Sequence, residues 1–81
     1  MGYEDDAVIT FGLLVRQRRQ ELNMTQEELA HRAKLHRTYI GDIERGTRNV
    51  AFKNLVRLCM ALHVHPADFL RDLRWPSRYA K

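Results

Sequence analysis

Apolar residues recur along this chain at the three- and four-residue steps of an amphipathic helix, and no stretch alternates as a half-buried strand does. Phe11, Val15 and Leu22, for example, share one face of the segment that follows Asp6. The pattern predicts an all-α fold of five helices. Their expected ranges are residues 7–22, 26–33, 37–45, 52–62 and 66–75.

Residue types with known preferences for helix ends support these boundaries. Thr25 stands three residues before Glu28, a spacing that predicts a capping box and a helix starting at Gln26. Asn23 is expected to end the first helix in a left-handed conformation, which Asn tolerates well. If Lys34 ends the second helix in the same conformation, the cost is roughly 1–2 kcal/mol.

The remaining boundaries carry weaker signals. Asp6 is expected to cap the first helix, and residues 1–6 before it form a flexible tail. His36 is a poor predicted cap for the third helix, and Ala51 offers the fourth no capping side chain. Pro66 suits the first turn of the fifth helix, which Pro76 should end by residue 74 or 75. Residues 76–81 are then a C-terminal tail of a single domain spanning residues 1–81.

The segment from residue 25 to residue 48 has the features of a helix-turn-helix. Two helices that cross at a steep angle over a short turn need a small residue at the crossing, and Ala30 is in that place. Branched residues are wanted on the buried side of the second of them, where Ile40 and Ile43 stand. The alternative is an ordinary helical hairpin with a solvated polar face.

The outward face of the helix that starts at Arg37 mixes donors, acceptors and an aromatic edge, as base recognition in a major groove requires. The planar fork of Arg37 matches the two acceptors of a guanine. Asp42 has three open roles, namely accepting from a cytosine amine, holding an arginine in place, or repelling wrong sites. The predicted base-reading residues are Arg37, Thr38, Tyr39 and Asp42.

The net charge of +4 favours a polyanionic partner. Residues 31–48 hold five Lys and Arg side chains against two carboxylates, so +3 of the excess lies in this segment. Gln26, together with the free amides at the start of its helix, is predicted to bind a phosphate. His36 and Arg45 are expected to approach the DNA backbone as well.

The motif TQEELA (residues 25–30) resembles the helix-turn-helix of phage repressors and their relatives, the lambda-repressor-like fold. Within that superfamily RTYIGDIERGTRN (residues 37–49) closely resembles the controller proteins of restriction-modification systems. The resemblance spans roughly residues 11–70. It implies a five-helix lambda-repressor-like DNA-binding domain with the helix-turn-helix at helices 2 and 3.

The resemblance also implies roles for particular residues. Arg48 and Asn49 match positions that contact the DNA backbone in the controller proteins. Arg19 and Glu44 match positions that form an ion pair in repressors of this family. The alternative for Arg19 is a side chain that extends along the helix surface to solvent.

The functional expectation is a controller protein that regulates its own gene and the restriction endonuclease gene, activating at low occupancy and repressing at high occupancy. One alternative is a phage- or plasmid-type repressor, or an antitoxin-like regulator that also binds a toxin. Another is a helical protein-interaction module without a role in DNA binding. The expected location is the cytoplasm, in association with the nucleoid, and RNA polymerase is a further candidate partner.

Apolar residues beyond the needs of a small core suggest a homodimer that binds a two-fold symmetric DNA operator, with half-sites about 34 Å apart. The alternative is that these residues complete the core of a monomer. The candidate dimer residues are Val56, Met60, Phe69, Leu73 and Trp75.

Other chemistry is not expected. Cys59, His63 and His65 straddle a helix end and fall short of the usual four-ligand zinc pattern, so we expect no metal. The phase of Cys59 with Leu55 and Leu62 indicates burial, which disfavours a thiol nucleophile. The sequence contains no paired carboxylates around a pocket and no glycine-rich phosphate loop. We therefore expect no enzymatic activity, no cofactor and no small-molecule ligand. No apolar run approaches the ~18 residues of a membrane span.

Overall fold

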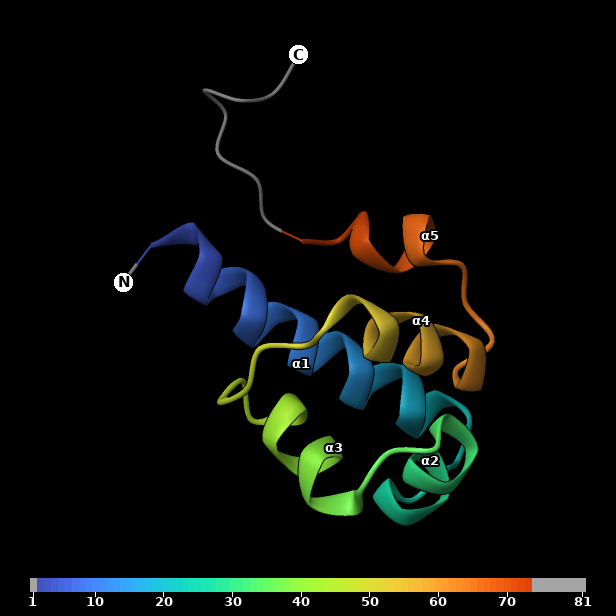
Figure 1. Cartoon of the computed structure of the whole chain (residues 1–81). Coiled ribbons are helices and arrows are strands. Elements are labelled where there is room, and N and C mark those ends of the chain that lie inside the picture. Colours follow the sequence, from blue (N-terminus) through green and yellow to red (C-terminus); the bar gives the residue numbers. More distant parts are fainter. Residues whose placement is uncertain (1, 74–81) are drawn as a thin grey trace.

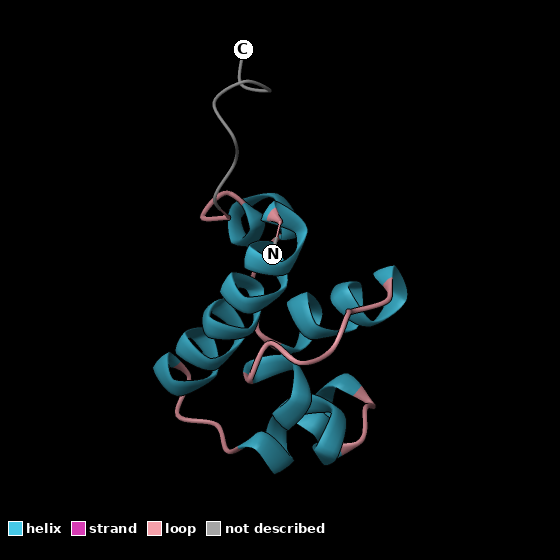
Figure 2. Cartoon of the chain, turned by 90° about the vertical axis from the view of Figure 1, so that its left-hand side faces the viewer, coloured by secondary structure: helices cyan, strands magenta, loops and turns pink. Residues whose placement is uncertain are grey.

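The structure is a computed structural model that describes residues 2–73 of the chain. Within that range there are five α-helices and no strand, which confirms the predicted all-α architecture. The helices are α1 (Tyr3–Glu21), α2 (Gln26–Ala33), α3 (Arg37–Glu44), α4 (Phe52–Ala61) and α5 (Pro66–Leu70). Figure 1 shows α1 running diagonally through the molecule, with α2 and α3 near one end and α4 and α5 on the other side. Figure 2 shows the loops that join them.

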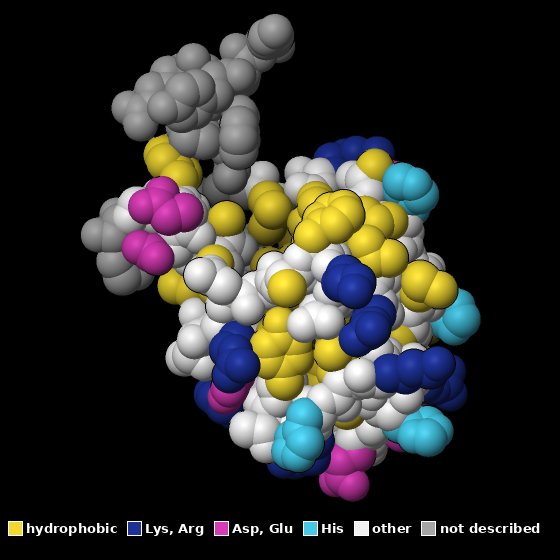
Figure 3. Space-filling view, viewed as in Figure 1, with side chains coloured by type: hydrophobic (Ala, Val, Ile, Leu, Met, Phe, Trp, Pro, Cys, Tyr) yellow, Lys and Arg dark blue, Asp and Glu magenta, His cyan; other side chains and the backbone are white. Residues whose placement is uncertain are grey.

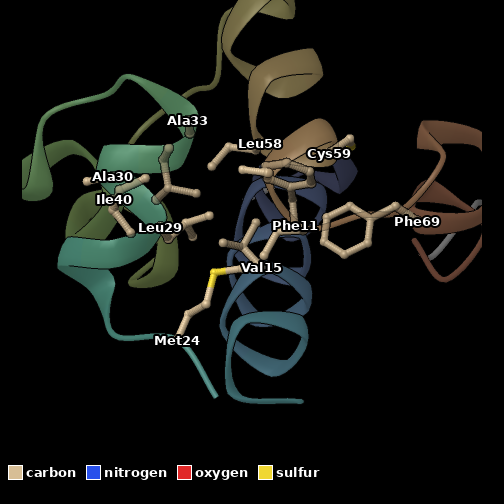
Figure 4. Packing of buried hydrophobic residues seen from close by; sticks show 13 residues of the cluster. Phe11, Val15, Met24, Leu29, Ala30, Ala33, Ile40, Leu58, Cys59 and Phe69 are labelled. Carbon is tan, nitrogen blue, oxygen red and sulfur yellow. The ribbon is translucent and has the colours of Figure 1, made fainter. Parts of the chain in front are cut away.

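A single hydrophobic core joins all five helices. Val15 of α1, Leu29 of α2 and Leu58 of α4 are fully buried in it. At its α5 end the rings of Phe11 and Phe69 meet edge to face, with centroids 5.6 Å apart (Figure 4). This core fixes α2 and α3 against α1, which positions the outward face of α3.

The predicted start and end of α2 are confirmed. The Thr25 hydroxyl accepts from the Glu28 amide at 3.0 Å, and the Glu28 carboxylate accepts from the Thr25 amide at 3.0 Å. The hydrogen bond from the Thr25 backbone amide stabilises the ionised carboxyl and lowers the pKa of Glu28. Lys34 ends the helix at φ 60°, and Asn23 has φ 57° beyond α1, so both adopt the expected left-handed conformation.

The outer boundaries of α1 and α5 differ from those predicted. α1 begins at Tyr3, so Asp6 lies in its first turn instead of capping it, and residues 3–6 are helix instead of tail. The carboxylate of Asp5 accepts from the Gly2 amide at 3.3 Å and closes the first turn. α5 ends at Leu70, several residues before Pro76, because the Leu73 amide bonds to the Leu70 carbonyl in a tight turn and leaves the helical pattern.

His36 is a better cap than the sequence suggested. Its Nδ1 accepts from the Thr38 amide at 3.1 Å at the start of α3. His65 does the same for the Ala67 amide of α5 at 2.9 Å. A neutral imidazole has one unprotonated nitrogen, and that nitrogen serves as the acceptor usually supplied by Ser, Thr or Asp.

The start of α4 has no capping side chain, because Ala51 is its N-cap residue and forms no side-chain cap hydrogen bond. We expect Ala51→Ser to raise the free energy of unfolding by roughly 0.5–2 kcal/mol, since a serine hydroxyl would accept from a free amide of the first turn. Urea denaturation measures the gain. Arg57→Ser, at an exposed position in the middle of α4, is the control and should give no gain. Equal midpoints for the two variants would contradict the prediction.

Candidate nucleic-acid interface

α3 is the second helix of the helix-turn-helix, and its two faces differ in character. Ile40 and Ile43 are buried against the core, and the small Ala30 of α2 lies buried beside them, as the helix-turn-helix pattern predicted. The opposite face leaves Arg37 and Thr38 exposed. Figure 3 shows His, Lys and Arg side chains, with some Asp and Glu side chains among them, along the lower part of the molecule, where α2 and α3 lie in Figure 1.

Arg37 extends into solvent from the first turn of α3. Its side chain is 59% exposed, and its Nε lies 3.7 Å from Oε1 of Glu27, which is also exposed. An exposed ion pair of this kind contributes less than about 1 kcal/mol. The guanidinium is therefore free to leave Glu27 for a stronger partner.

Two of the other base-reading candidates, Tyr39 and Asp42, form a connected network with Arg45 and the loop after α3. Asp42 forms ion pairs with Arg45 and with Arg48, the latter at 3.6 Å. The guanidinium of Arg48 lies over the ring of Tyr39, 4.9 Å from its centroid. The structure thus brings together Tyr39 and Asp42, which are predicted to read bases, with Arg45 and Arg48, which are predicted to bind phosphates.

Asn54 of α4 completes this network, and no sequence pattern predicts its part in it. Its Nδ2 donates to the Tyr39 hydroxyl at 3.1 Å in a partly buried position. In the sequence, an Asn in the first turn of a helix looks the same whether its side chain faces solvent or contacts another helix. Only the packing of α4 beside α3 reveals that Asn54 fixes the orientation of Tyr39.

A buried ion pair anchors the end of α3 to α1. Arg19 Nε donates to Glu44 Oε2 at 2.7 Å, and Nη2 donates to Oε1 at 3.0 Å. The two side chains are only 12% and 4% exposed, so the predicted pair is confirmed and the solvent-extended alternative for Arg19 is excluded. Hydrogen bonding to Glu44 raises the pKa of Arg19.

Gln26 is part of the same cluster. Its Nε2 donates to Oε1 of Glu44 at 3.1 Å, so this amide is held within the protein instead of pointing freely to a phosphate. The prediction from the sequence gives Gln26 a phosphate-binding role only. The arrangement ties the first residue of α2 to the last residue of α3, and so fixes the two helices of the motif relative to each other.

Comparison with known proteins places this geometry in a family. The helix-turn-helix family model matches residues 15–69. Control protein C.BamHI of Bacillus amyloliquefaciens is 54% identical over 63 residues, which cover 76% of this chain and 78% of that protein. The solved restriction-modification controller protein C.AhdI of Aeromonas hydrophila superposes with a TM-score of 0.74 at 37% identity, covering 76% of this chain and 94% of that one. The chain belongs to the restriction-modification controller proteins.

A further controller protein, C.Esp1396I, has been solved as a tetramer in complex with its natural 35 base-pair operator. This chain superposes on it with a TM-score of 0.76 at 36% identity, over 83% of this chain and 88% of that one. The matched regions include the α2–α3 motif described above. The family resemblance read from residues 37–49 is therefore confirmed.

The structure alters the predicted dimer surface of this controller. Phe69 is not on an exposed patch, because it is 6% exposed and packs on Phe11 in the core. Leu73 is only partly buried against the same core. Met60 is 71% exposed and Phe52, which the sequence analysis missed, is 77% exposed, while Val56 between them is half-buried. Trp75 lies outside the described residues.

Two remaining observations bear on alternative chemistry. Cys59 is buried in the core, and burial raises the pKa of its thiol, which lowers the reactive thiolate fraction. None of the helices in residues 2–73 combines the length and the apolar character that crossing a membrane requires.

Proposed function

We propose that this chain is a sequence-specific, duplex-DNA-binding transcriptional regulator that controls its own gene and the endonuclease gene of a restriction-modification system. The observation that carries the proposal is the exposed face of α3, with Arg37 at its start and the Asp42, Arg45 and Arg48 group at its end. Membership of the controller family supports the regulatory role. The location that goes with this proposal is the cytoplasm, in association with the nucleoid.

In this proposal the two ends of the motif divide the work of recognition. The start of α3 enters the major groove, where Arg37 donates two hydrogen bonds to one guanine and Thr38 and Tyr39 contact neighbouring base edges. The free amides at the start of α2 face a phosphate. The remaining backbone contacts come from His36, Arg45, Arg48 and Asn49, and from the second N–H of the Gln26 amide, whose first N–H is bonded to Glu44.

Arg37→Ala is expected to weaken binding to the operator by about 1–3 kcal/mol and to relax the preference at one base pair of each half-site. The reason is that the lost hydrogen bonds are specific to a guanine edge. Affinities for the operator and for a set of single-base variants measure both effects.

Arg48→Ala is the matched control. It also removes one arginine, but from the loop after α3 and not from the start of α3, where the bases are read. It should weaken binding to all sequences alike and reduce the salt dependence by about one ion per site. If Arg37→Ala lowers affinity equally on every variant, Arg37 is only a backbone contact, and Tyr39 becomes the leading candidate for base reading.

We further propose that the controller acts as a homodimer through the outer face of α4. Phe52, Val56 and Met60 stand four residues apart and form one stripe along that helix. An exposed apolar stripe of this kind is a typical interaction surface. Leu73 and Trp75 remain proposed contributors. Two copies related by a two-fold axis would present α3 to half-sites about 34 Å apart.

Met60→Asp is expected to weaken self-association and operator binding together, because it puts a charge into the proposed interface. Met60 tests the surface more cleanly than Leu73, since Leu73 also packs on the core. Sedimentation at tens of micromolar measures the mass. Leu13→Asp, at a 55% exposed position of α1, is the control and should leave the dimer intact. An unchanged dimer in Met60→Asp would refute the α4 interface.

Activation at low occupancy adds RNA polymerase as a proposed partner. Transcription with purified polymerase and a promoter that carries the operator tests this step. Increasing amounts of the regulator should first raise and then lower the yield of transcript. A yield that only falls would make the protein a repressor alone.

A further inference from the structure

The carboxylate of Asp42 lies between two arginines. Its Oδ1 pairs with Nη2 of Arg45, and its Oδ2 lies 3.6 Å from Nη1 of Arg48. The Asp42 side chain is 24% exposed, whereas the two arginines are 62% and 57% exposed. The carbonyl of Asp42 also accepts from the Thr47 amide at 3.0 Å and from the Thr47 hydroxyl at 3.1 Å. Asp42 therefore organises both the charges and the loop at the end of α3.

Asp42 and a DNA phosphate would compete for the same two guanidinium groups. A guanidinium has five N–H donors, so it can bind a phosphate while one edge stays on Asp42. The carboxylate nevertheless repels the phosphate and partly neutralises the arginines. Every duplex of any sequence meets this opposition, because phosphates are the same everywhere.

We propose that Asp42 limits binding to random DNA by restraining Arg45 and Arg48, which lowers the affinity for every duplex by a similar factor. This inference rests on the proposed DNA-binding function and adds a role that opposes binding to random sequence. On the operator, the base contacts of Arg37 and its neighbours offset this loss, so the complex still forms. Random DNA lacks those contacts, so the same loss leaves it largely unbound at concentrations that occupy the operator.

The geometry favours this role over a direct base contact by Asp42. A carboxylate that reads a cytosine amine needs a free oxygen directed into the groove. Here each oxygen has an arginine partner, and one of those partners is held in turn over the Tyr39 ring. Asp42 acts through the arginines and is a positioning residue.

Asp42→Asn tests the inference, since it removes the charge and keeps the shape. The probes are the operator duplex selected from a random library and a scrambled duplex of equal length, each at several salt concentrations. We expect affinity for the scrambled duplex to rise about three- to tenfold at low salt, as for the loss of one or two ion pairs. Its salt dependence should steepen, and operator affinity should rise by a similar factor. The ratio of the two affinities should therefore stay about the same, while less protein should suffice to occupy random DNA.

Asp68→Asn is the matched control. It makes the same change in net charge on α5, where Asp68 is 59% exposed and pairs with Arg71 at 2.9 Å. It should change the affinities for both duplexes equally and slightly. Both variants are compared at a concentration where they have the same oligomeric state. If Asp42→Asn is poorly folded, Asp42→Ala replaces it.

A second measurement separates restraint of the arginines from other roles. In a background of Arg45→Gln and Arg48→Gln, the change Asp42→Asn should no longer raise affinity for the scrambled duplex. A gain that persists there overturns the inference, as does an operator loss without any gain on scrambled DNA. If the unmodified protein binds neither duplex, the proposed function itself fails. If it prefers the operator but Asp42→Asn behaves as Asp68→Asn does, only the role of Asp42 fails.

Discussion

Glu44→Ala is expected to lower the free energy of unfolding by about 3–5 kcal/mol, because it leaves the Arg19 guanidinium in a largely buried place without its counter-ion. The loss also releases Gln26, whose amide bonds to the same carboxylate. We therefore expect the start of α2 and the end of α3 to be held less firmly against each other and against α1. Chemical denaturation of the single variants and of Arg19→Ala/Glu44→Ala together measures the coupling energy.

The exposed pair of Arg18 and Glu21 is the control for this cycle. The two side chains are 3.5 Å apart and 31% and 53% exposed. Glu21→Ala should cost less than about 1 kcal/mol. A coupling energy near zero between Arg19 and Glu44 would mean that their bidentate contact contributes nothing to stability.

Gly12→Ala should destabilise the protein by about 2–3 kcal/mol, even though alanine is the better helix former. Gly12 is buried where α1 crosses the end of α3. A β-carbon at this position would overlap the Ile43 carbonyl oxygen and lie 3.0 Å from that of Glu44. Both obstacles are backbone atoms, so the two helices would have to move apart.

Gly41→Ala is the matched control, because it makes the same substitution in α3. The nearest atom to its new β-carbon would be Nη1 of Arg45 at 3.1 Å, the far end of a flexible side chain. That side chain can move, so we expect little loss or a gain of up to about 1 kcal/mol from helix propensity. The difference between the two midpoints in urea measures the effect. Equal stability of the two variants would contradict the close approach at Gly12.

Local signals predicted the middle of the fold well. The Thr25 and Glu28 spacing gave the start of α2, and the left-handed residues Asn23 and Lys34 were assigned correctly. These features depend on atoms a few residues apart, so the sequence contains them in full. The end of α5 was missed because Pro76 sets only an outer limit, while the turn at residues 71–73 depends on local packing.

Features that depend on contacts between distant segments were not accessible in the same way. An apolar residue such as Phe69 has the same pattern whether it fills a core or covers a dimer interface. From the sequence, Gly12 is only a residue that weakens a helix. Its close approach to the backbone of α3 is visible only in the folded structure. The hydrogen bond between Asn54 and Tyr39 joins two helices, and the sequence of neither helix predicts it. The Arg19–Glu44 pair was found only through the family resemblance, because the two residues are 25 positions apart.

Selection of bound duplexes from a random library tests whether α3 reads a particular DNA sequence. We expect enrichment of a two-fold symmetric sequence, with half-sites about one helical turn apart and a guanine in each half whose preference is lost in Arg37→Ala. A pool that stays random through successive rounds, while the protein still binds all duplexes in a salt-dependent way, would contradict sequence-specific reading by α3. The surface of α3 would then serve only as an electrostatic contact.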